Sequence, residues 1–302
     1  MSKQEGEAFV IATENNKPSQ LKKAQKYLAS FVTNRKQRDQ VNFNIDHNVW
    51  KIPPVFMLSL TVFQIAVFVF YSIRYLFGLT DDAVEKMAFF GGCITSIFSV
   101  SPLHPYQLWR YFTHAFLHLR VYHLFKNMIV QIFLGIPQEI AFRINVIGPL
   151  YFGGVVFSEI IMNAIKRRDL FLCGASGGDY ALLFAQIANL FMNWKEIPYR
   201  KAQALILFAD IFLDFAEDLM NLILGKEIKY DHGTHLHAAL FGLLYGLFFM
   251  YYKKENVKLR VTRYVLVSFY ILCLAVAIIQ NIIFYVNDDS VYEATELDIL
   301  KL

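Results

Sequence analysis

The sequence predicts an all-α polytopic membrane protein, a bundle of six core transmembrane helices followed by a C-terminal seventh. Three observations predict this fold class. The 302 residues are 56% hydrophobic and only 18% charged, which is too apolar for an ordinary soluble domain. Apolar stretches of membrane-spanning length recur along the chain, and small residues recur within them at helical spacing.

Seven stretches are long enough, or nearly so, to cross a hydrocarbon core of about 30 Å. The second and sixth are weaker because they contain polar residues. In chain order the seven cover residues 55–76, 122–136, 146–165, 171–191, 202–224, 236–251 and 264–285. An eighth apolar run, 87–100, is shorter than a span and stops before Pro102, so we interpret it as a re-entrant or interfacial element.

The basic residues predict the orientation. With the N-terminus in the cytosol, 18 Lys and Arg residues fall in cytosolic segments and ten lie outside or at outer helix ends. Cytoplasmic loops normally hold the excess of these residues. Counting 87–100 as a span would put the basic cluster at 253–263 outside, so we do not count it. We therefore expect a cytosolic N-terminus and an external, acidic C-terminus.

The chain divides into three expected parts. Residues 1–52 are polar and predict a cytosolic N-terminal region, either a solvated, partly disordered tail or a basic segment lying against anionic lipid. Because they lack the apolar core of a cleavable signal, we expect the first span to act as the anchor. Residues 53–286 form the membrane domain, and 287–302 form a short lumenal or extracellular tail. The absence of an internal repeat argues against transporters built from repeated halves.

Two of the apolar helices contain a serine and a histidine. Residues 174–178 read Gly-Ala-Ser-Gly-Gly, and His235 stands before a stripe formed by Ala238, Gly242 and Gly246. Small residues at matching positions 174, 178, 181 and 185 would let the two backbones approach closely. Polar side chains within a membrane usually face the bundle interior. We therefore expect Ser176 and His235 within hydrogen-bond reach, as the activation of a weak serine nucleophile requires.

A third motif begins at Trp109-Arg110, continues through His114 and His118, and runs on to His123 and Asn127. His123 and Asn127 are four residues apart, so both project from one face of the second span. Two donors at one place, together with the backbone N–H of Ser176, would stabilise the oxyanion of a tetrahedral intermediate.

These motifs, taken in order from residue 109 to residue 246, resemble those of the rhomboid intramembrane serine proteases. The resemblance implies a rhomboid-like bundle and a Ser–His dyad with no carboxylate as a third member. It implies a role for each of ten residues: Ser176 as nucleophile, His235 as general base, His123 and Asn127 as oxyanion stabilisers, Tyr180 stacked against the histidine, Gly174 two residues before the serine, Trp109 and Arg110 in the membrane-dipping first loop, and His114 and His118 holding that loop to the outer end of the second span.

The resemblance also implies an activity and a place in the cell. We expect a serine endopeptidase that cleaves single-span membrane proteins, such as precursors of EGF-like growth factors, and releases their ectodomains. The seven-helix arrangement resembles the animal secretory-pathway branch, in the Golgi, endosome or plasma membrane. The expected partners are these substrates and the lipid bilayer. We expect no cofactor, no metal and no nucleic-acid partner.

This chain departs from the family pattern at three positions. Ala238 replaces a glycine that usually follows the catalytic histidine by three residues, and Lys126 and Asp179 stand where family members are usually apolar. A lone charge in a bundle is costly, whereas a pair costs less. We expect Lys126 to contact Asp179 or, failing that, Asp214 or Asp218 of the fifth span. These two acids belong to a stripe on one helix face that would either line a substrate gate or stabilise the bundle: Asp210, Asp214, Glu217 and Asp218.

Three other interpretations use the same residues. The glycines and the serine would serve helix packing alone if His235 lay elsewhere. The histidines at 114, 118, 123, 232, 235 and 237 would suit a zinc site of a transporter, but they fall at outer helix ends rather than at the midplane. A catalytically inactive relative would bind membrane clients without cleaving them. The three cysteines are widely spaced and predict neither disulfides nor a zinc knuckle.

Overall fold

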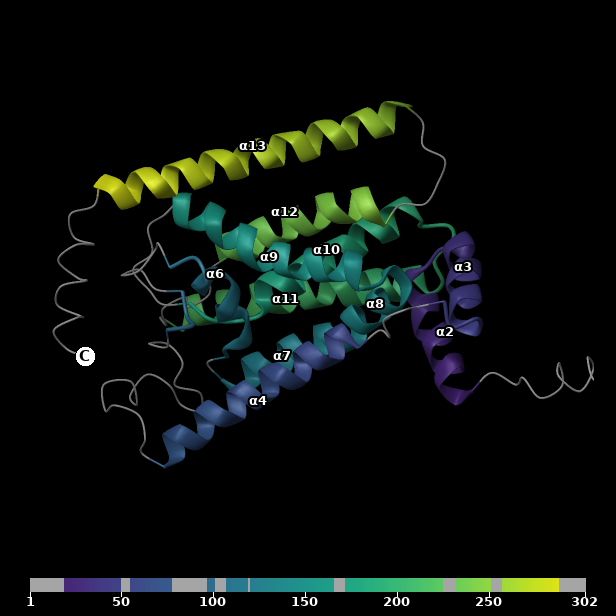
Figure 1. The fold of residues 1–302 in the computed structure, drawn as a ribbon, viewed down its shortest axis with the longest axis horizontal. Helices are drawn as coiled ribbons and strands as arrows, with labels where there is room; N and C mark the ends of the chain where they lie inside the picture. Colours follow the sequence, from purple (N-terminus) through teal and green to yellow (C-terminus); the bar gives the residue numbers. More distant parts are fainter. Residues whose placement is uncertain are drawn as a thin grey trace, which may run out of the picture.

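The computed structural model describes residues 19–49, 55–77, 97–100, 107–118, 120–165, 172–224, 232–250 and 257–287. Within these ranges the chain is helical, and one isolated β-bridge pairs Val100 with Leu172. Long helices run side by side, and a shorter helical hairpin crosses one end of them (Figure 1). The predicted all-α fold class is therefore confirmed. The expected re-entrant run at 87–100 lies outside the described residues except for its last four.

Each of the seven expected spans contains a helix. By length and composition alone, three helical segments of the described chain are able to cross a membrane, Phe56–Arg74, Ile144–Ile165 and Arg260–Ile283, and Gly233–Phe249 is a shorter apolar helix. The helices are α4 (Phe56–Leu76), α7 (Val121–Val130) continued by η2 (Gln131–Gly135) and α8 (Ile136–Phe142), α9 (Ile144–Ile165), α10 (Ser176–Met192), α11 (Arg200–Ile223), α12 (His232–Phe249) and α13 (Val257–Asn287).

The second span differs from a simple helix in two ways. Its middle segment, η2, is a π-helical turn, a feature that often occurs near functional sites. Its last segment, α8, carries Glu139, whose carboxylate accepts the backbone N–H groups of Phe56 and Met57 at 2.8 Å each. The first N–H groups of a helix have no acceptor within it, so Glu139 satisfies the start of α4 with a charge suited to a helix N-terminus.

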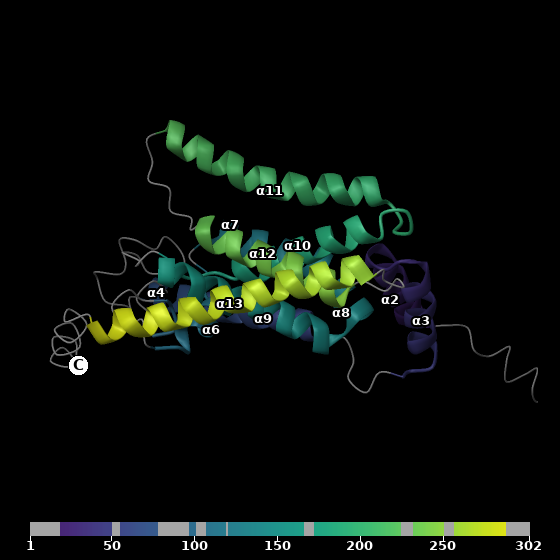
Figure 2. The ribbon, with the colours of Figure 1, turned by 90° about the horizontal axis from the view of Figure 1, so that it is seen from above.

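Helix α10 lies in the middle of the bundle and packs against both α9 and α12, which also contact each other (Figures 1 and 2). Small residues explain this close approach. A Cβ on Gly242 of α12 would stand 2.6 Å from the Cα of Ala181, and one on Gly246 would stand 2.7 Å from the Cα of Ala185. The predicted contact between the two small-residue stripes is therefore confirmed, and it brings the start of α12 beside the start of α10.

We expect Gly242→Ala to destabilise the bundle by about 1–3 kcal/mol, because the added methyl group would overlap backbone atoms that cannot rotate away. The matched control is Gly148→Ala in α9, where an added Cβ would lie 3.7 Å from a side-chain carbon of Ile144, an ordinary contact. Thermal unfolding in detergent measures both variants. Equal stability of the two would contradict the close-packing account.

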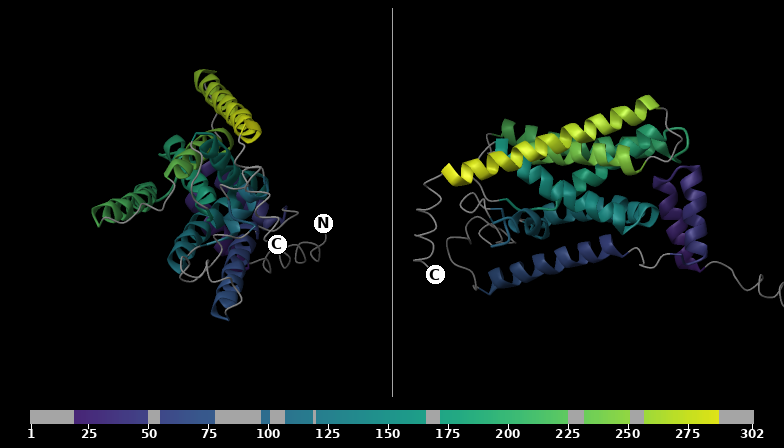
Figure 3. Two further views of the ribbon diagram at one scale, coloured as in Figure 1. Left: turned by 90° about the vertical axis from the view of Figure 1, so that its left-hand side faces the viewer. Right: turned by 45° about the horizontal axis from the view of Figure 1, so that its top comes forward.

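Helices α4, α11 and α13 project outward from the central helices in different directions (Figure 3). Large apolar side chains on them are widely exposed. Examples on α11 and α13 are Leu205, Phe208, Phe212, Phe215, Val265 and Phe269, each at least 60% exposed. Lipid tails are as apolar as these side chains, so the exposure suits helices that face the bilayer of an integral membrane protein.

The N-terminal region contains a folded hairpin, α2 (Gln20–Val32) and α3 (Arg35–Asp46), so the expectation of a solvated, partly disordered tail is wrong for residues 19–49. A capping box forms the turn, because the Asn34 side chain accepts the Gln37 N–H and the Gln37 side chain accepts the Asn34 N–H. Buried side chains of the hairpin pack against α8, and these are Ala29, Val41 and Ile45 with Ile140.

Side-chain amides dock the hairpin onto the helical bundle. The Asn34 amide donates to Asn193 at 3.1 Å, the Asn189 amide to the Val32 carbonyl at 2.7 Å, and the Gln37 amide to the Met250 carbonyl at 3.1 Å. These contacts lie at the C-terminal ends of α10 and α12. Because Ser176 and His235 lie at the N-terminal ends of the same helices, the hairpin and the serine–histidine pair occupy opposite ends of the bundle.

Candidate active site

Ser176 is the first residue of α10, five residues later than the start predicted for the fourth span. The chain reaches it through Gly174, whose φ of +144° is open to glycine and strained for other residues. The Gly174 N–H donates to the carbonyl of His114 at 3.0 Å, which fixes the chain before the serine. Ser176 itself is half-buried at the end of the bundle, where its hydroxyl faces α12.

His235 lies in the first turn of α12 and contacts the serine directly. Its Nε2 atom is 2.9 Å from the Ser176 Oγ, so the expected hydrogen bond is present. When Nε2 carries no proton, it accepts the hydroxyl proton, as a general base must. The imidazole also stacks on the ring of Tyr180, with centroids 4.4 Å apart and planes 12° apart, which is the predicted stacking.

His123 and Asn127 project from α7 toward the same region. The His123 ring covers Gly174, since a Cβ there would stand 2.7 Å from its Cε1. Asn127 is buried, and its amide donates to His118 Nε2 at 3.0 Å. An amide nitrogen has two N–H groups, so this bond uses one of them. Both side chains therefore lie near the serine loop, but their role toward an oxyanion stays a prediction.

His118 is the acceptor in this pair. Burial, followed by the positive charge that nearby His123 would carry, holds the pKa of His118 well below its ordinary value. A neutral imidazole with an unprotonated Nε2 is the form that accepts the Asn127 amide. His118 thus links the loop to α7, the second span, as predicted.

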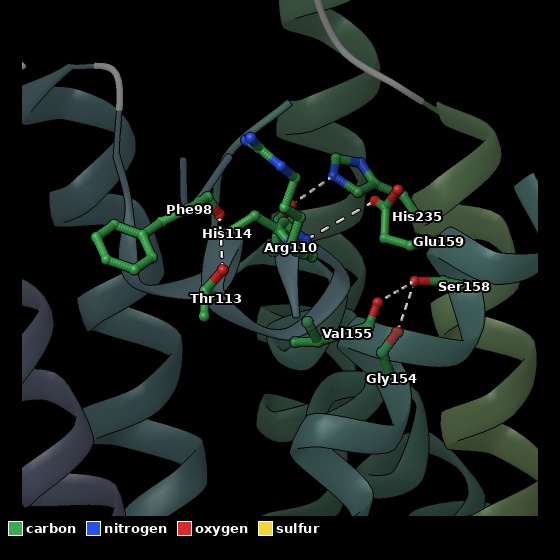
Figure 4. Close-up of polar contacts among 10 residues, drawn as sticks. Phe98, Arg110, Thr113, His114, Gly154, Val155, Ser158, Glu159 and His235 are labelled. Carbon is green, nitrogen blue, oxygen red and sulfur yellow. Dashed lines mark hydrogen bonds and ion pairs between the residues drawn. The ribbon is translucent and has the colours of Figure 1, made fainter. Parts of the chain in front are cut away.

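His114 points elsewhere, which differs from the expectation that it would also hold the loop to the second span. Its Nδ1 lies 3.0 Å from the carbonyl of Arg110, and its Nε2 lies 3.9 Å from Glu159 of α9. Figure 4 shows the Glu159 carboxylate facing His114. Because the His114 carbonyl also accepts Gly174, this residue ties the loop to α9 and to the serine motif. No motif in the sequence pointed to Glu159.

The first loop contains two short turns, α6 (Arg110–Thr113) and η1 (His114–Phe116). Arg110 is buried and donates to Gln107 at 2.5 Å and to the Ser99 carbonyl at 2.9 Å. Trp109 is 52% exposed, and its indole N–H donates to the Ile97 carbonyl. The β-bridge between Val100 and Leu172 joins the segment that Trp109 and Arg110 contact to the segment that precedes Ser176. Trp109 and Arg110 therefore organise the loop, each in a different way.

A buried polar cluster, which no sequence motif indicated, lies beneath the site. The Tyr151 hydroxyl accepts the amides of Gln64 and Gln131 at 3.2 and 3.1 Å, and Thr61 donates to Gln131 at 3.0 Å. Such networks link helices firmly where their members are satisfied, and in this one the Gln64 amide oxygen is buried without a hydrogen-bond partner among the described residues. Glutamines within apolar spans were the available signal, because polar residues there usually face the bundle interior.

Lys126 forms an ion pair with Asp214 of α11, one of the two partners expected if Asp179 did not pair with it. Asp214 also accepts the Tyr180 hydroxyl at 2.5 Å. The side chain of Asp218 lies outside the described residues. Within the described part of the chain, the expected ion pair between Lys126 and Asp179 does not form. Asp214 instead joins α11 to both α7 and α10.

Asp179 is 4% exposed, and neither of its carboxyl oxygens has a hydrogen bond within 3.5 Å among the described residues, so the Gln131 side chain contributes only a longer, weaker contact. Lys126 and Asp210 are the charged residues that act on it at longer range. A buried polar group without a partner loses its hydration without compensation. This position therefore lowers the stability of the bundle.

We expect Asp179→Val to stabilise the protein by about 1–3 kcal/mol, the usual penalty of one unsatisfied buried group. On the same thermal-unfolding measurement in detergent, Asp214→Val should destabilise it, because that change removes a paired charge and leaves Lys126. A loss of stability in Asp179→Val would mean that its carboxyl group has a partner, such as water.

No group of three or more His, Cys, Asp or Glu side chains is arranged to hold a metal ion in the described part of the chain. Cys173 and Cys273 form no disulfide and are of intermediate exposure, and Cys93 lies outside the described residues. The histidines nearest the serine are instead occupied with the contacts given above.

The fold and site together define a class of protein, a polytopic helical membrane protein with a serine–histidine pair at one end of its bundle. The family model for the rhomboid domain matches residues 105–252. Rhomboid-related protein 1 of Caenorhabditis elegans is 32% identical over 282 residues, which cover 91% of this chain and 77% of that protein. The chain therefore belongs to the rhomboid family.

Two further relatives differ in what their names say. Inactive rhomboid-related protein 2 of Caenorhabditis elegans is 28% identical over 71% of this chain and 59% of its own length. Rhomboid-like protease 2 of Toxoplasma gondii is 24% identical over 73% of this chain and 75% of its own. Family membership thus supports a protease-like membrane protein, and the activity of this chain depends on its own residues.

Proposed function

We propose that this protein is an intramembrane serine endopeptidase that cleaves single-span membrane proteins. The observation that supports the proposal is the 2.9 Å contact between Ser176 Oγ and His235 Nε2, at the end of a bundle where two helices approach at their glycines. A nucleophile and a base within hydrogen-bond distance are the minimum for acyl transfer by serine.

In the first step, His235 takes the hydroxyl proton while Ser176 Oγ attacks the carbonyl carbon of the scissile peptide. The carbonyl oxygen becomes an oxyanion, which the N–H of Ser176 and the side chains of His123 and Asn127 would stabilise. The C–N bond then breaks, and His235 returns the proton to the leaving amine. An acyl ester on Ser176 remains.

In the second step, water attacks the ester carbon and gives a proton to His235. The ester C–O bond breaks, the proton returns to Ser176 Oγ, and the carboxyl product leaves. Stacking on Tyr180 would hold the imidazole in one plane through both steps, and a face-on aromatic ring also favours the imidazolium that forms between them.

Substrates of such a site should unwind easily. A helix hides its peptide bonds in internal hydrogen bonds, so residues that destabilise helices should favour cleavage near them. Precursors of EGF-like growth factors are the substrate class that the family resemblance suggests. We further propose residues 1–52 as a cytosolic region, 53–286 as the membrane protease domain and 287–302 as a lumenal tail, in a protein of the Golgi, endosome or plasma membrane.

The alternative is an inactive member that binds membrane clients without cleaving them, since one relative carries that name. The purified protein, incubated in detergent with a fluorogenic transmembrane substrate, separates the two. Cleavage that disappears in Ser176→Ala supports the protease. Binding of the substrate without cleavage, at equal strength in both proteins, would support the inactive client-binding protein.

A further inference from the structure

Asp214 is the point at which α11 meets the rest of the site. It accepts the Tyr180 hydroxyl of α10 at 2.5 Å and forms an ion pair with Lys126 of α7. Its side chain is only 16% exposed, whereas many neighbours on α11 point outward. Figure 2 shows α11 along the outer side of α7, α10 and α12. A peripheral helix thus contributes one inward-facing carboxylate.

This carboxylate is connected to the reacting atoms by a short series of contacts. Asp214 accepts a hydrogen bond from the Tyr180 hydroxyl, and the Tyr180 ring stacks on His235 with ring centroids 4.4 Å apart. His235 Nε2 in turn lies 2.9 Å from Ser176 Oγ. A hydrogen bond from a hydroxyl group to a carboxylate is shorter and stronger than a hydrogen bond between neutral groups. It therefore restrains the Tyr180 ring, and the plane of that ring sets the plane of the imidazole.

We infer that Asp214 is a positioning residue for His235, acting through the Tyr180 hydroxyl, with Lys126 holding its carboxylate in place. The inference rests on the proposed protease function. In this arrangement a carboxylate on a separate helix supports the base without touching it. The charged groups around the connection are Lys126 from α7, Asp179 from α10 and Asp210 from α11.

Three substitutions separate the parts of this connection. Tyr180→Phe removes the hydroxyl and keeps both the stacking ring and the Lys126–Asp214 ion pair. Asp214→Asn removes the charge, and Lys126→Met removes the ion pair while keeping the tyrosine bond. Asp210→Asn is the matched control, because Asp210 lies one helical turn away on the same face of α11 and has no bond to Tyr180 among the contacts described.

We expect Tyr180→Phe and Asp214→Asn each to lower kcat by roughly 10- to 100-fold with little change in KM, because a small displacement of a catalytic group can cost about that much. The double variant should be no slower than the slower single variant, since both changes break one connection. Asp214→Glu should regain part of the rate when Tyr180 is present and none in the Tyr180→Phe background. Asp210→Asn removes a neighbouring charge without breaking the contact with Tyr180, so it should lower kcat much less than Asp214→Asn does.

A second measurement needs no turnover, so it separates this inference from the proposed function. Hydrogen–deuterium exchange at the imidazole C2–H of His235, followed by mass spectrometry, reports how freely that ring meets solvent. Exchange should be faster in Tyr180→Phe and Asp214→Asn than in wild type or Asp210→Asn. Absence of cleavage in wild type would remove the protease assignment alone. Unchanged exchange at His235, or rate losses confined to KM, would overturn the role of Asp214.

Discussion

Replacing Ser176 by alanine should lower turnover of a transmembrane substrate by roughly 10⁴-fold or more, the scale on which loss of a nucleophile acts. His235→Ala should have a similar effect, because the hydroxyl is a weak nucleophile until the imidazole 2.9 Å away accepts its proton. Initial rates of fluorogenic substrate cleavage in detergent measure both. The two residues act as a unit, so the double variant should be no slower than either single variant.

The control for this pair is the stability of the bundle. Ser176→Ala removes one oxygen from a half-buried position at the start of α10, so its thermal unfolding should stay close to that of wild type. Cleavage that persists in purified Ser176→Ala protein would exclude the serine as nucleophile. A large loss of stability would make the rate measurement ambiguous, and Ser176→Gly or Ser176→Cys would then separate folding from chemistry.

Asn127→Ala and His123→Ala should each reduce kcat by roughly 10- to 1000-fold, the range for losing one donor to an oxyanion, with smaller changes in substrate affinity. The measurement is a full dependence of rate on substrate concentration for each variant. A combined loss that exceeds either single loss would indicate that the two side chains stabilise the charge separately.

The matched control is His118→Ala. It removes the acceptor that Asn127 contacts at 3.0 Å but leaves the amide itself. We expect it to affect stability more than rate, by about 1 kcal/mol for one hydrogen bond. Full turnover in both Asn127→Ala and His123→Ala would mean that other groups form the oxyanion hole. A rate loss in His118→Ala as large as that in Asn127→Ala would mean that Asn127→Ala acts by displacing the loop, rather than by removing an oxyanion donor.

The contacts between α10 and α12 were predictable because spacing determines them. Small residues at i and i+4 on two helices allow close approach wherever the helices meet, and Gly242 does lie against Ala181. Once those helices meet, Ser176 and His235 have little freedom. The spacing of small residues along α10 and α12 was therefore enough to predict how these helices pack. The hydrogen bond between Ser176 and His235 followed from that packing.

Other contacts depend on how distant segments dock, and spacing leaves them open. Lys126 had three acidic candidates within plausible reach, and the position of α11 selects Asp214 among those described. His114 contacts Glu159 because the loop lies against α9 rather than α7. The N-terminal hairpin docks through amides that meet carbonyls on helices far along the chain, such as Asn189 with Val32. A polar segment read by composition alone gives no sign of such docking.

The central claim is that Ser176 is a nucleophile activated by His235. The most direct measurement is covalent labelling with a fluorophosphonate, which forms a stable bond to an activated serine oxygen, followed by peptide mass spectrometry of the detergent-purified protein. If His235 activates Ser176, one adduct forms, on Ser176, and it is lost in Ser176→Ala and strongly reduced in His235→Ala. An unlabelled wild-type protein, or an adduct that forms equally in His235→Ala, would contradict it.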